Sequence, residues 1–272
     1  MLLINHNGGR LGNSIFRLFA NILFCIIYDA EIKTENQVYG NKIEITDEFF
    51  VQWSNDLLNG KVLHLDKSLI CVFSGYFQHD TIYLKYKNEI INYITNNPNI
   101  MLTTHFNENY KAIDLVNYKL TRTYDIVIHL RLEDFIEISS KIPFVMNPVC
   151  IKNIIKEINN DYPEKEICLV LNKPTNELEF KYINFLKKDS NNIIVESNDP
   201  ITDFNIMKHA KVLVCSCSTL SWSASFMSTT IEKLYFPNYS FSSIHETFKK
   251  SIENTILYDF TKCTKDELEN IL

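Results

Sequence analysis

Short apolar runs and longer amphipathic segments alternate along this chain. Runs of strand length lie at 1–5, 61–65, 69–73, 125–130, 167–171, 192–195, 212–215 and 233–236. Segments with helical spacing lie among them, at 14–28, 81–94, 148–159, 175–187, 201–210 and 219–230. Such alternation is typical of α/β proteins with parallel sheets. The pattern therefore predicts an α/β fold, most regular from residue 124 onward.

A polar, asparagine-rich stretch at 107–125 interrupts this alternation. The chain is 272 residues long, which is enough for two compact domains. We predict one domain over 1–118, a second over 119–260 and a short C-terminal helix over 261–272. A helix in that position often packs back across the first domain of a two-domain enzyme.

The charge balance narrows the set of partners. With 27 basic and 33 acidic residues the net charge is −6, which is not the profile of a nucleic-acid coat or a polybasic membrane binder. The N-terminus lacks a basic n-region, and the apolar stretch 15–28 is short and interrupted for a bilayer span. We therefore expect a soluble, cytoplasmic protein with no nucleic-acid partner and no integral membrane segment. Peripheral membrane attachment and the oligomeric state stay open.

Cysteines give no sign of a metal site. Seven are scattered along the chain, mostly inside apolar runs, as is typical of buried free thiols in a reducing compartment. Cys215 and Cys217 are close in sequence, but no Cys/His metal spacing accompanies them. We expect no bound metal.

Glycine is scarce and concentrated at one point. There are 6 glycines in 272 residues, where about 7% is usual, and three of them are Gly8, Gly9 and Gly12. They lie between a predicted strand and a predicted helix, where backbone N–H groups can bind an anion. Arg10 and Asn13 add a cation and an amide to the same turn. The alternative is a tight turn that only needs positive φ.

The segment "YDIVIHLRLEDF" is predicted to be a buried strand that is followed by charged and polar side chains. In open α/β sheets, ligands bind beyond the carboxyl ends of strands. Period 2 places His129 and Arg131 on the same face, and the arginine fork suits phosphate. The alternatives are a structural Arg131–Asp134 ion pair and, for Glu133 and Asp134, a solvated acidic loop.

A run of small polar residues precedes Trp222, in "VCSCSTLSWS". Ser218 or Thr219 can cap the following helix, and the hydroxyls can also donate to a phosphate. Plain capping is the alternative. The Gly-x-Ser-x-Gly turn of a serine nucleophile is absent, so a catalytic serine is not expected.

Four segments in order resemble the α-1,2-fucosyltransferase family, within the wider group of GDP-fucose-using transferases that includes the α-1,6 and protein O-fucosyl enzymes. They are "GGRLGNSIFRLFA", "SGYFQHDTIYLKYKNEI", "IHLRLEDF" and "DFNIMKHAKVLVCSCSTLSWSASFMS", and together they span residues 8–228. The resemblance implies a GT-B fold, with two Rossmann-like domains facing a donor cleft. It also implies inverting, metal-independent transfer of L-fucose from GDP-fucose to a glycan, typically to the 2-OH of a β-galactoside. No cofactor is implied, and the chain contains no Asp-x-Asp motif.

The same resemblance implies roles for particular residues. Arg131 would contact the phosphates, while His129 and Asp203 would bind guanine. The mechanism, rather than the resemblance, makes Asp134 the first candidate for a catalytic base, and the alternative is that Asp134 orients Arg131. The remaining donor contacts would come from Ser218 and Thr219 at the pyrophosphate, and from Gly9, Arg10 and Asn13 of the first domain at the sugar-phosphate.

This chain also departs from the family pattern. Leu132 replaces the usual second arginine, Glu133 a common glycine, Cys217 an asparagine and Ser223 the second tryptophan. Glu133 and Glu137 remain further candidates for a catalytic base. Two other functions therefore stay open: a transferase that uses another nucleotide-sugar, and a non-catalytic protein of this fold that binds a glycan or nucleotide.

Overall fold

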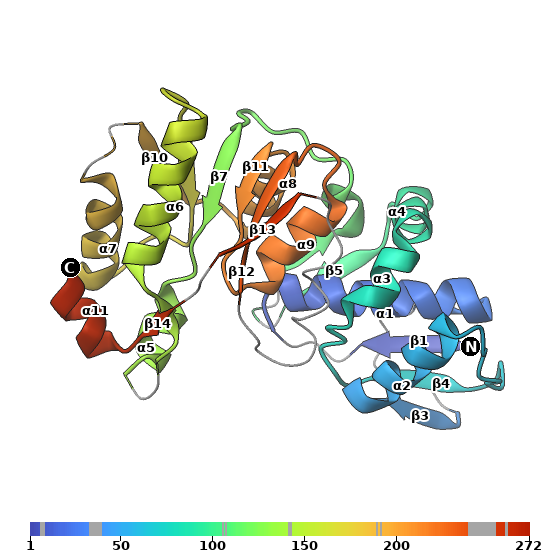
Figure 1. Cartoon of the computed structure of the whole chain (residues 1–272). Coiled ribbons are helices and arrows are strands. Elements are labelled where there is room, and N and C mark those ends of the chain that lie inside the picture. The colour runs from blue at the N-terminus through green and yellow to red at the C-terminus, as the bar shows by residue number, and fades with distance from the viewer. Residues whose placement is uncertain are drawn as a thin grey trace. The chain divides into compact units, whose positions relative to one another are not determined.

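The computed structural model describes residues 1–5, 9–32, 40–104, 106, 108–140, 143–188, 190, 192–238, 254–258 and 261–272. The chain forms two compact units, Met1–Tyr118 (unit 1) and Lys119–Leu272 (unit 2). In Figure 1 unit 1 runs from blue to teal and unit 2 from green to red. The junction falls inside the polar stretch 107–125, where apolar residues for a core are few.

Unit 1 is built on a four-stranded parallel sheet in the order β2–β1–β4–β3. The strands are β1 (Leu2–Asn5), β2 (Glu31–Ile32), β3 (Lys42–Ile45) and β4 (Ile70–Phe73). The helices are α1 (Leu11–Tyr28), α2 (Asp47–Leu58), α3 (Asp80–Lys85) and α4 (Lys87–Asn96). A hairpin of β5 (Met101–Thr103) and β6 (Asn109–Lys111) follows, and then the 3-10 turn Ala112–Leu115.

Helix α1 is the central helix of unit 1. It is 18 residues long and, by length and composition, it is the one helix of the described residues that could cross a membrane. The helix is longer than the apolar stretch 15–28 from which no membrane span was expected. However, 78% of it is buried inside the protein.

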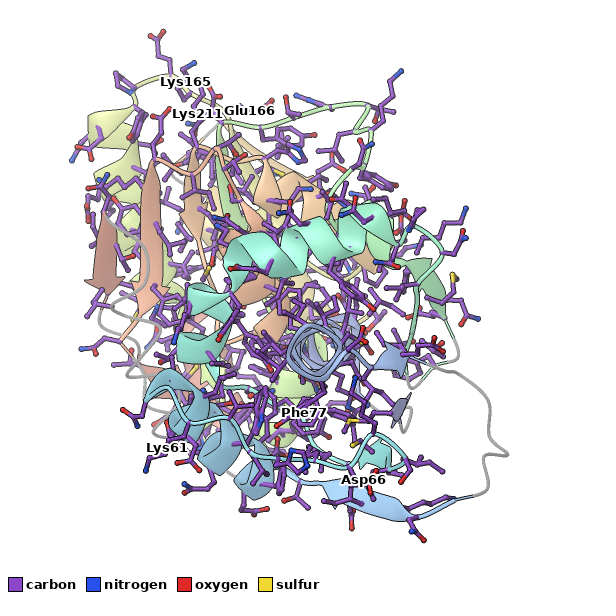
Figure 2. The ribbon with its side chains drawn as sticks, turned by 90° about the vertical axis from the view of Figure 1, so that its right-hand side faces the viewer. Lys61, Asp66, Phe77, Lys165, Glu166 and Lys211 are labelled. Carbon is purple, nitrogen blue, oxygen red and sulfur yellow. The ribbon has the colours of Figure 1, made fainter. Side chains whose placement is uncertain are left out.

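Aromatic side chains fill the core around α1. Phe24 packs 4.5 Å from Trp53 and 5.1 Å from Phe73, measured between ring centroids. Phe77, labelled in Figure 2, is buried and packs edge-on against Phe50 and Phe73. Large rings at these distances bury a large apolar area against so small a sheet.

Unit 2 contains a six-stranded parallel sheet in the order β10–β9–β7–β11–β12–β13. The strands are β7 (Ile126–His129), β9 (Ile167–Val170), β10 (Ile193–Glu196), β11 (Val212–Val214), β12 (Lys233–Pro237) and β13 (Thr255–Tyr258). Numbered along the chain, this is the 3-2-1-4-5-6 order of a doubly wound fold. The direction of winding reverses between β7 and β11, which are neighbours.

Helices cover both faces of this sheet. They are α5 (Glu133–Ile138), α6 (Pro148–Asp161), α7 (Glu177–Lys187), α8 (Pro200–Lys208) and α9 (Thr219–Met227). Ile126 and Ile128 of β7 pack into the core with α6 and α7, so the alternate residue, His129, belongs to the face of α8, which packs on β7 and on α9. These helices are labelled in Figure 1.

The C-terminal segment is part of unit 2. Strand β14 (Lys262–Cys263) pairs antiparallel with β8 (Val145–Met146), and α11 (Lys265–Ile271) buries Leu268 in the same core as α6 and α7. The expectation that this helix packs across the first domain was therefore wrong, because its apolar side is used within its own unit.

Ion pairs stabilise the amino edge of the unit 2 sheet. Asp125 precedes β7 and pairs with Lys165 at 3.1 Å and Lys211 at 3.3 Å, which precede β9 and β11. Figure 2 shows Lys165 and Lys211 at this end of the unit. These charges therefore have a structural explanation, and the opposite, carboxyl edge is left for binding.

The α/β class and the parallel sheets are confirmed, but some predicted elements were wrong. Residues 61–65 form no strand, and Val62 is 60% exposed. The helix predicted over 81–94 breaks at Tyr86 into α3 and α4. Helices α2 and α5 were not predicted at all.

Candidate functional site

The carboxyl ends of β7 and β11 flank the point where the unit 2 sheet reverses its winding. His129 ends β7 and Arg131 follows it, while Ser216 and Ser218 follow β11. Ligands of doubly wound sheets bind at this place. Two motifs that lie far apart in the sequence therefore meet at one edge.

His129 is held as a neutral side chain. It is 5% exposed, and its Nδ1 lies 2.7 Å from the hydroxyl oxygen of Ser216. Burial, reinforced by the nearby Arg131 cation, lowers its pKa from 6.5 to about 3. At neutral pH the ring has one N–H donor and one acceptor, which suits a polar ligand rather than an anion.

Arg131 forms an ion pair with Asp134, a carboxylate of the next helix. Its Nε and Nη2 donate to the two oxygens of Asp134 at 3.0 and 2.8 Å, and the guanidinium lies 5.0 Å from the centre of the Phe135 ring. This bidentate pair fixes the plane of the fork. The ion pair expected as an alternative is present, and it is compatible with a third contact to phosphate.

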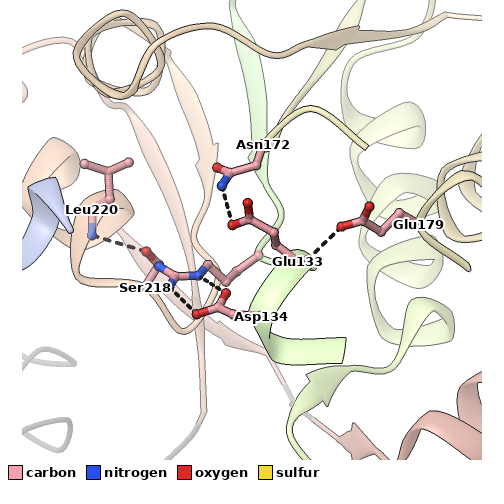
Figure 3. Close-up of polar contacts among 7 residues, drawn as sticks. Glu133, Asp134, Asn172, Glu179, Ser218 and Leu220 are labelled. Carbon is pink, nitrogen blue, oxygen red and sulfur yellow. Dashed lines mark hydrogen bonds and ion pairs between the residues drawn. The ribbon is translucent and has the colours of Figure 1, made fainter. Parts of the chain in front are cut away.

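The start of α5 is anchored to α7, as Figure 3 shows. The backbone N–H of Glu133 donates to Glu179 at 3.0 Å, and the amide of Asn172 donates to the Glu133 carboxylate at 2.5 Å. Glu179 is buried and also closes the capping box of α7 with Asn176. Glu133 is therefore not part of a solvated loop. The Asn-x-x-Glu spacing was the signal in the sequence that could have drawn attention to Glu179.

Ser218 is the N-cap of α9. Its hydroxyl accepts the N–H of Leu220 at 3.3 Å, and the Ser221 hydroxyl donates to the carbonyl of Ser218 at 3.1 Å. Thr219 is the first residue of the helix. The capping alternative is thus present, and the helix start directs its remaining N–H groups beyond the edge of the sheet.

Asp203 lies in the first turn of α8, after β10. One oxygen, Oδ1, accepts the backbone N–H and the side-chain amide of Asn198, at 3.2 and 3.1 Å. Burial outweighs these hydrogen bonds and, with the charges of Asp199 and Glu196, raises the pKa of Asp203 to about 7. A carboxyl with such a pKa is typical of a functional site.

In unit 1 the glycine loop and the segment 75–78 follow neighbouring strands, β1 and β4. Gly9 has φ +79, and a Cβ there would lie 2.7 Å from the amide nitrogen of Asn13. Gln78 donates its amide to Asn13 at 3.2 Å. Arg10 occupies the N-cap position of α1, and Gly8 lies outside the described residues.

Two residues missed in the sequence shape this part of unit 1. Asp47 accepts the backbone N–H groups of Tyr76 at 3.0 Å and Phe77 at 2.6 Å, and Arg17 donates to the carbonyl of Gly75 at 2.7 Å. A Cβ on Gly75 would lie 2.6 Å from Asp47, so glycine is required there. Neither contact has a signal in the local sequence.

No group of three or more His, Cys, Asp or Glu is placed to bind a metal within the part of the chain that the structure describes. All seven cysteines are free thiols. Burial raises the pKa of Cys217 to about 12, which keeps this thiol protonated at neutral pH.

Known proteins resemble this chain in structure and not in sequence. No protein-family model and no curated protein matches the sequence. The structure is similar to that of POFUT1 in complex with GDP-fucose, at 12% identity and a TM-score of 0.49, over 86% of this chain and 96% of that chain. It is also similar to a Listeria monocytogenes protein described as a UDP-N-acetylglucosamine 2-epimerase, at 9% identity and a TM-score of 0.47, over 99% and 86%.

Proposed function

We propose that this protein is an inverting, metal-independent glycosyltransferase that moves L-fucose from GDP-fucose to a glycan hydroxyl, the 2-OH of a β-galactoside. The observation that carries the proposal is the meeting of the His129-x-Arg131 strand end and the Ser216–Thr219 helix start at the winding reversal of a doubly wound sheet. A nucleotide diphosphate fits this place because it offers charge to the arginine and the helix start, and a base to neutral polar groups.

Each side chain has a part in binding the donor. Arg131 contacts the diphosphate while Asp134 keeps its fork in plane. Ser218 and Thr219 donate to the pyrophosphate at the start of α9, and His129 with Asp203 binds guanine. Gly9, Arg10 and Asn13 of unit 1 contact the sugar-phosphate, as the GT-B arrangement implied by the resemblance would allow.

The reaction needs stabilisation of a leaving group. The acceptor oxygen attacks the anomeric carbon opposite GDP, the bond from that carbon to the phosphate oxygen breaks, and GDP leaves with the electron pair. Arg131 stabilises the charge that develops on the diphosphate. The proton of the acceptor passes to Asp134 if this carboxylate acts as the base. Where Asp134 instead orients Arg131, the departing diphosphate or water takes the proton.

Incubation with GDP-fucose and a panel of β-galactosides, followed by linkage analysis, tests the proposal. We expect a fucosylated product without added metal. Replacing Arg131 by Ala should lower kcat about 100- to 1000-fold, because one stabilising donor is worth about 2.7–4 kcal/mol in the transition state. An Arg131→Ala enzyme with wild-type turnover would contradict the proposal.

A different nucleotide-sugar is the second candidate, favoured by one observation. Leu132, at the position of the usual second arginine, is buried in the unit 2 core and offers nothing to a phosphate. Thermal shift with GDP, UDP and dTDP separates the candidates, since a bound nucleotide raises the melting temperature. Stabilisation by UDP alone would replace GDP-fucose as the donor. Tight GDP binding without turnover would indicate a non-catalytic protein.

A further inference from the structure

A chain of hydrogen bonds leads from the interior of unit 2 to Asp203. The Tyr124 hydroxyl donates to one oxygen of Glu196, and the Asn198 amide donates to the other at 3.2 Å. The same amide donates to Asp203 Oδ1, as does the Asn198 backbone N–H. Tyr124 is buried and precedes β7, whereas Glu196 ends β10. These hydrogen bonds therefore join Asp203 to residues at two strands of the sheet.

The two carboxylate oxygens of Asp203 differ in their hydrogen bonds. Oδ1 accepts both hydrogen bonds from Asn198, while the described residues donate none to Oδ2. A carboxylate held by one oxygen presents the other as a fixed acceptor. Guanine offers two adjacent donors, N1–H and the 2-amino group, whereas adenine offers an acceptor at N1. A fixed acceptor therefore favours guanine over adenine.

We propose that Asn198, with Glu196 and Tyr124 behind it, positions the Asp203 carboxylate so that its second oxygen selects guanine in the bound nucleotide. The inference rests on the proposed function and assigns three positioning residues that act through Asp203. Asn198 makes both hydrogen bonds to Asp203, and Glu196 with Tyr124 keeps the Asn198 amide in place.

The charges around Asp203 explain why such support is needed. Glu196 and Asp199 are both close enough to favour its protonated form, and burial does the same. Helix α9, which packs on α8, carries no titratable side chain, and His129 of β7 is neutral. The two Asn198 hydrogen bonds oppose protonation. The Asn198 side chain supplies one of these two hydrogen bonds, so without it a larger share of the carboxyl is protonated at neutral pH and cannot act as an acceptor.

Calorimetric titration of the full chain with GDP, IDP and ADP tests this inference. IDP keeps the N1–H donor and lacks the 2-amino group. The wild type should bind GDP more tightly than IDP, and IDP more tightly than ADP. Replacing Asn198 by Ala should weaken GDP binding about tenfold at pH 7, the effect of one hydrogen bond to a charged group, with little change for ADP. At pH 8 the loss should shrink, because a larger share of Asp203 is then ionised in the variant as well, while GDP keeps its N1–H donor.

Two further variants complete the test. Tyr124→Phe should reduce the ratio of GDP to ADP affinity in the same direction and by less, since it loosens only Glu196. Asn159→Ala removes an asparagine of α6 that bonds to Ser190 and Asn192, and it should leave the ratio unchanged.

The failures are distinguishable. Equal weakening of GDP and ADP in Asn198→Ala, or an unchanged ratio in both Asn198→Ala and Tyr124→Phe, would overturn the positioning role while the proposed function stands. A wild type that binds GDP no better than ADP would overturn the role of Asp203 in base selection. A wild type that binds no GDP would overturn this inference and the proposed function together.

Discussion

At the scale of single residues, burial sets the protonation of the groups at the carboxyl edge of unit 2. His129 and Asp203 are both nearly buried, and each is driven toward its neutral form: the pKa of His129 falls to about 3 and that of Asp203 rises to about 7. Arg131 is less buried, and its charge is matched by Asp134 at 2.8 Å. The edge thus combines one fixed cation with two groups whose charge depends on their surroundings.

The raised pKa of Asp203 predicts a pH-dependent stability. Its folded-state pKa exceeds the unfolded value, so the stabilisation is complete below about pH 4 and is lost as the pH rises through 7. Asn cannot titrate. The free energy of unfolding of the wild type relative to Asp203→Asn should therefore fall by about 3 kcal/mol between pH 5 and pH 8, as urea denaturation can measure. A difference that does not change with pH would contradict the assignment.

At the scale of elements, a single side chain couples two helices. Glu179 closes the capping box of α7 and also accepts the N–H of Glu133 at the start of α5. Because α5 also carries Asp134, the partner of Arg131, the position of the arginine fork depends on a buried carboxylate of another helix.

Replacing Glu179 by Ala tests this coupling. The change leaves the backbone N–H groups of Thr175, Asn176 and Glu133 without their acceptor, and should lower the free energy of unfolding by about 3 kcal/mol. The rate of transfer should fall as well, since α5 is no longer anchored. The matched control is Glu177→Ala in the same helical turn, where the side chain pairs only with Lys181 at the surface and little change is expected. Equal effects of the two variants would remove Glu179 from this role.

At the scale of the whole molecule, the two units carry different parts of the proposed chemistry. The residues assigned to guanine and diphosphate all belong to unit 2, whereas Gly9, Arg10 and Asn13 belong to unit 1. Unit 1 builds its own polar edge, where Gln78 bonds to Asn13 and Asp47 shapes the loop after β4.

Replacing Asn13 by Ala should therefore separate binding from transfer. The affinity for GDP should stay within about twofold of the wild type, since no base or diphosphate contact is lost. Transfer from GDP-fucose should fall about tenfold or more, because one hydrogen bond on the sugar side of the sugar-phosphate is missing, and GDP lacks this sugar. Calorimetry with GDP and a product assay give the two numbers, with Asn55→Ala on the exposed side of α2 as control. A parallel loss of both would show that unit 1 also binds the nucleotide.

The pattern of neighbouring residues predicts the helices and strands better than it predicts which side chains contact one another. The run "YDIVIH" forms β7 because its apolar residues suit a strand buried on both faces, and Ser218 caps α9 as its position before an apolar helix indicates. The same reasoning failed for 61–65, an alternating run that is mostly exposed and forms no strand, and for Glu133, whose partner Glu179 lies 46 residues away.

By itself, the sequence determined the α/β class, the strand and helix ends that bear His129, Arg131 and Ser218, and the resemblance to GDP-fucose transferases. These follow from hydrophobic periodicity, capping and motif order, which are properties of neighbouring residues. Only the tertiary structure decided that His129 meets Ser216 across 87 positions, that Asp134 holds Arg131, and that Asn198 joins Asp203 to Glu196. The first contact depends on the order of strands in the sheet, which is set by packing between segments far apart in the chain. The other two join residues close in sequence, and they depend on how the segments after β7 and β10 fold and on which of their side chains become buried.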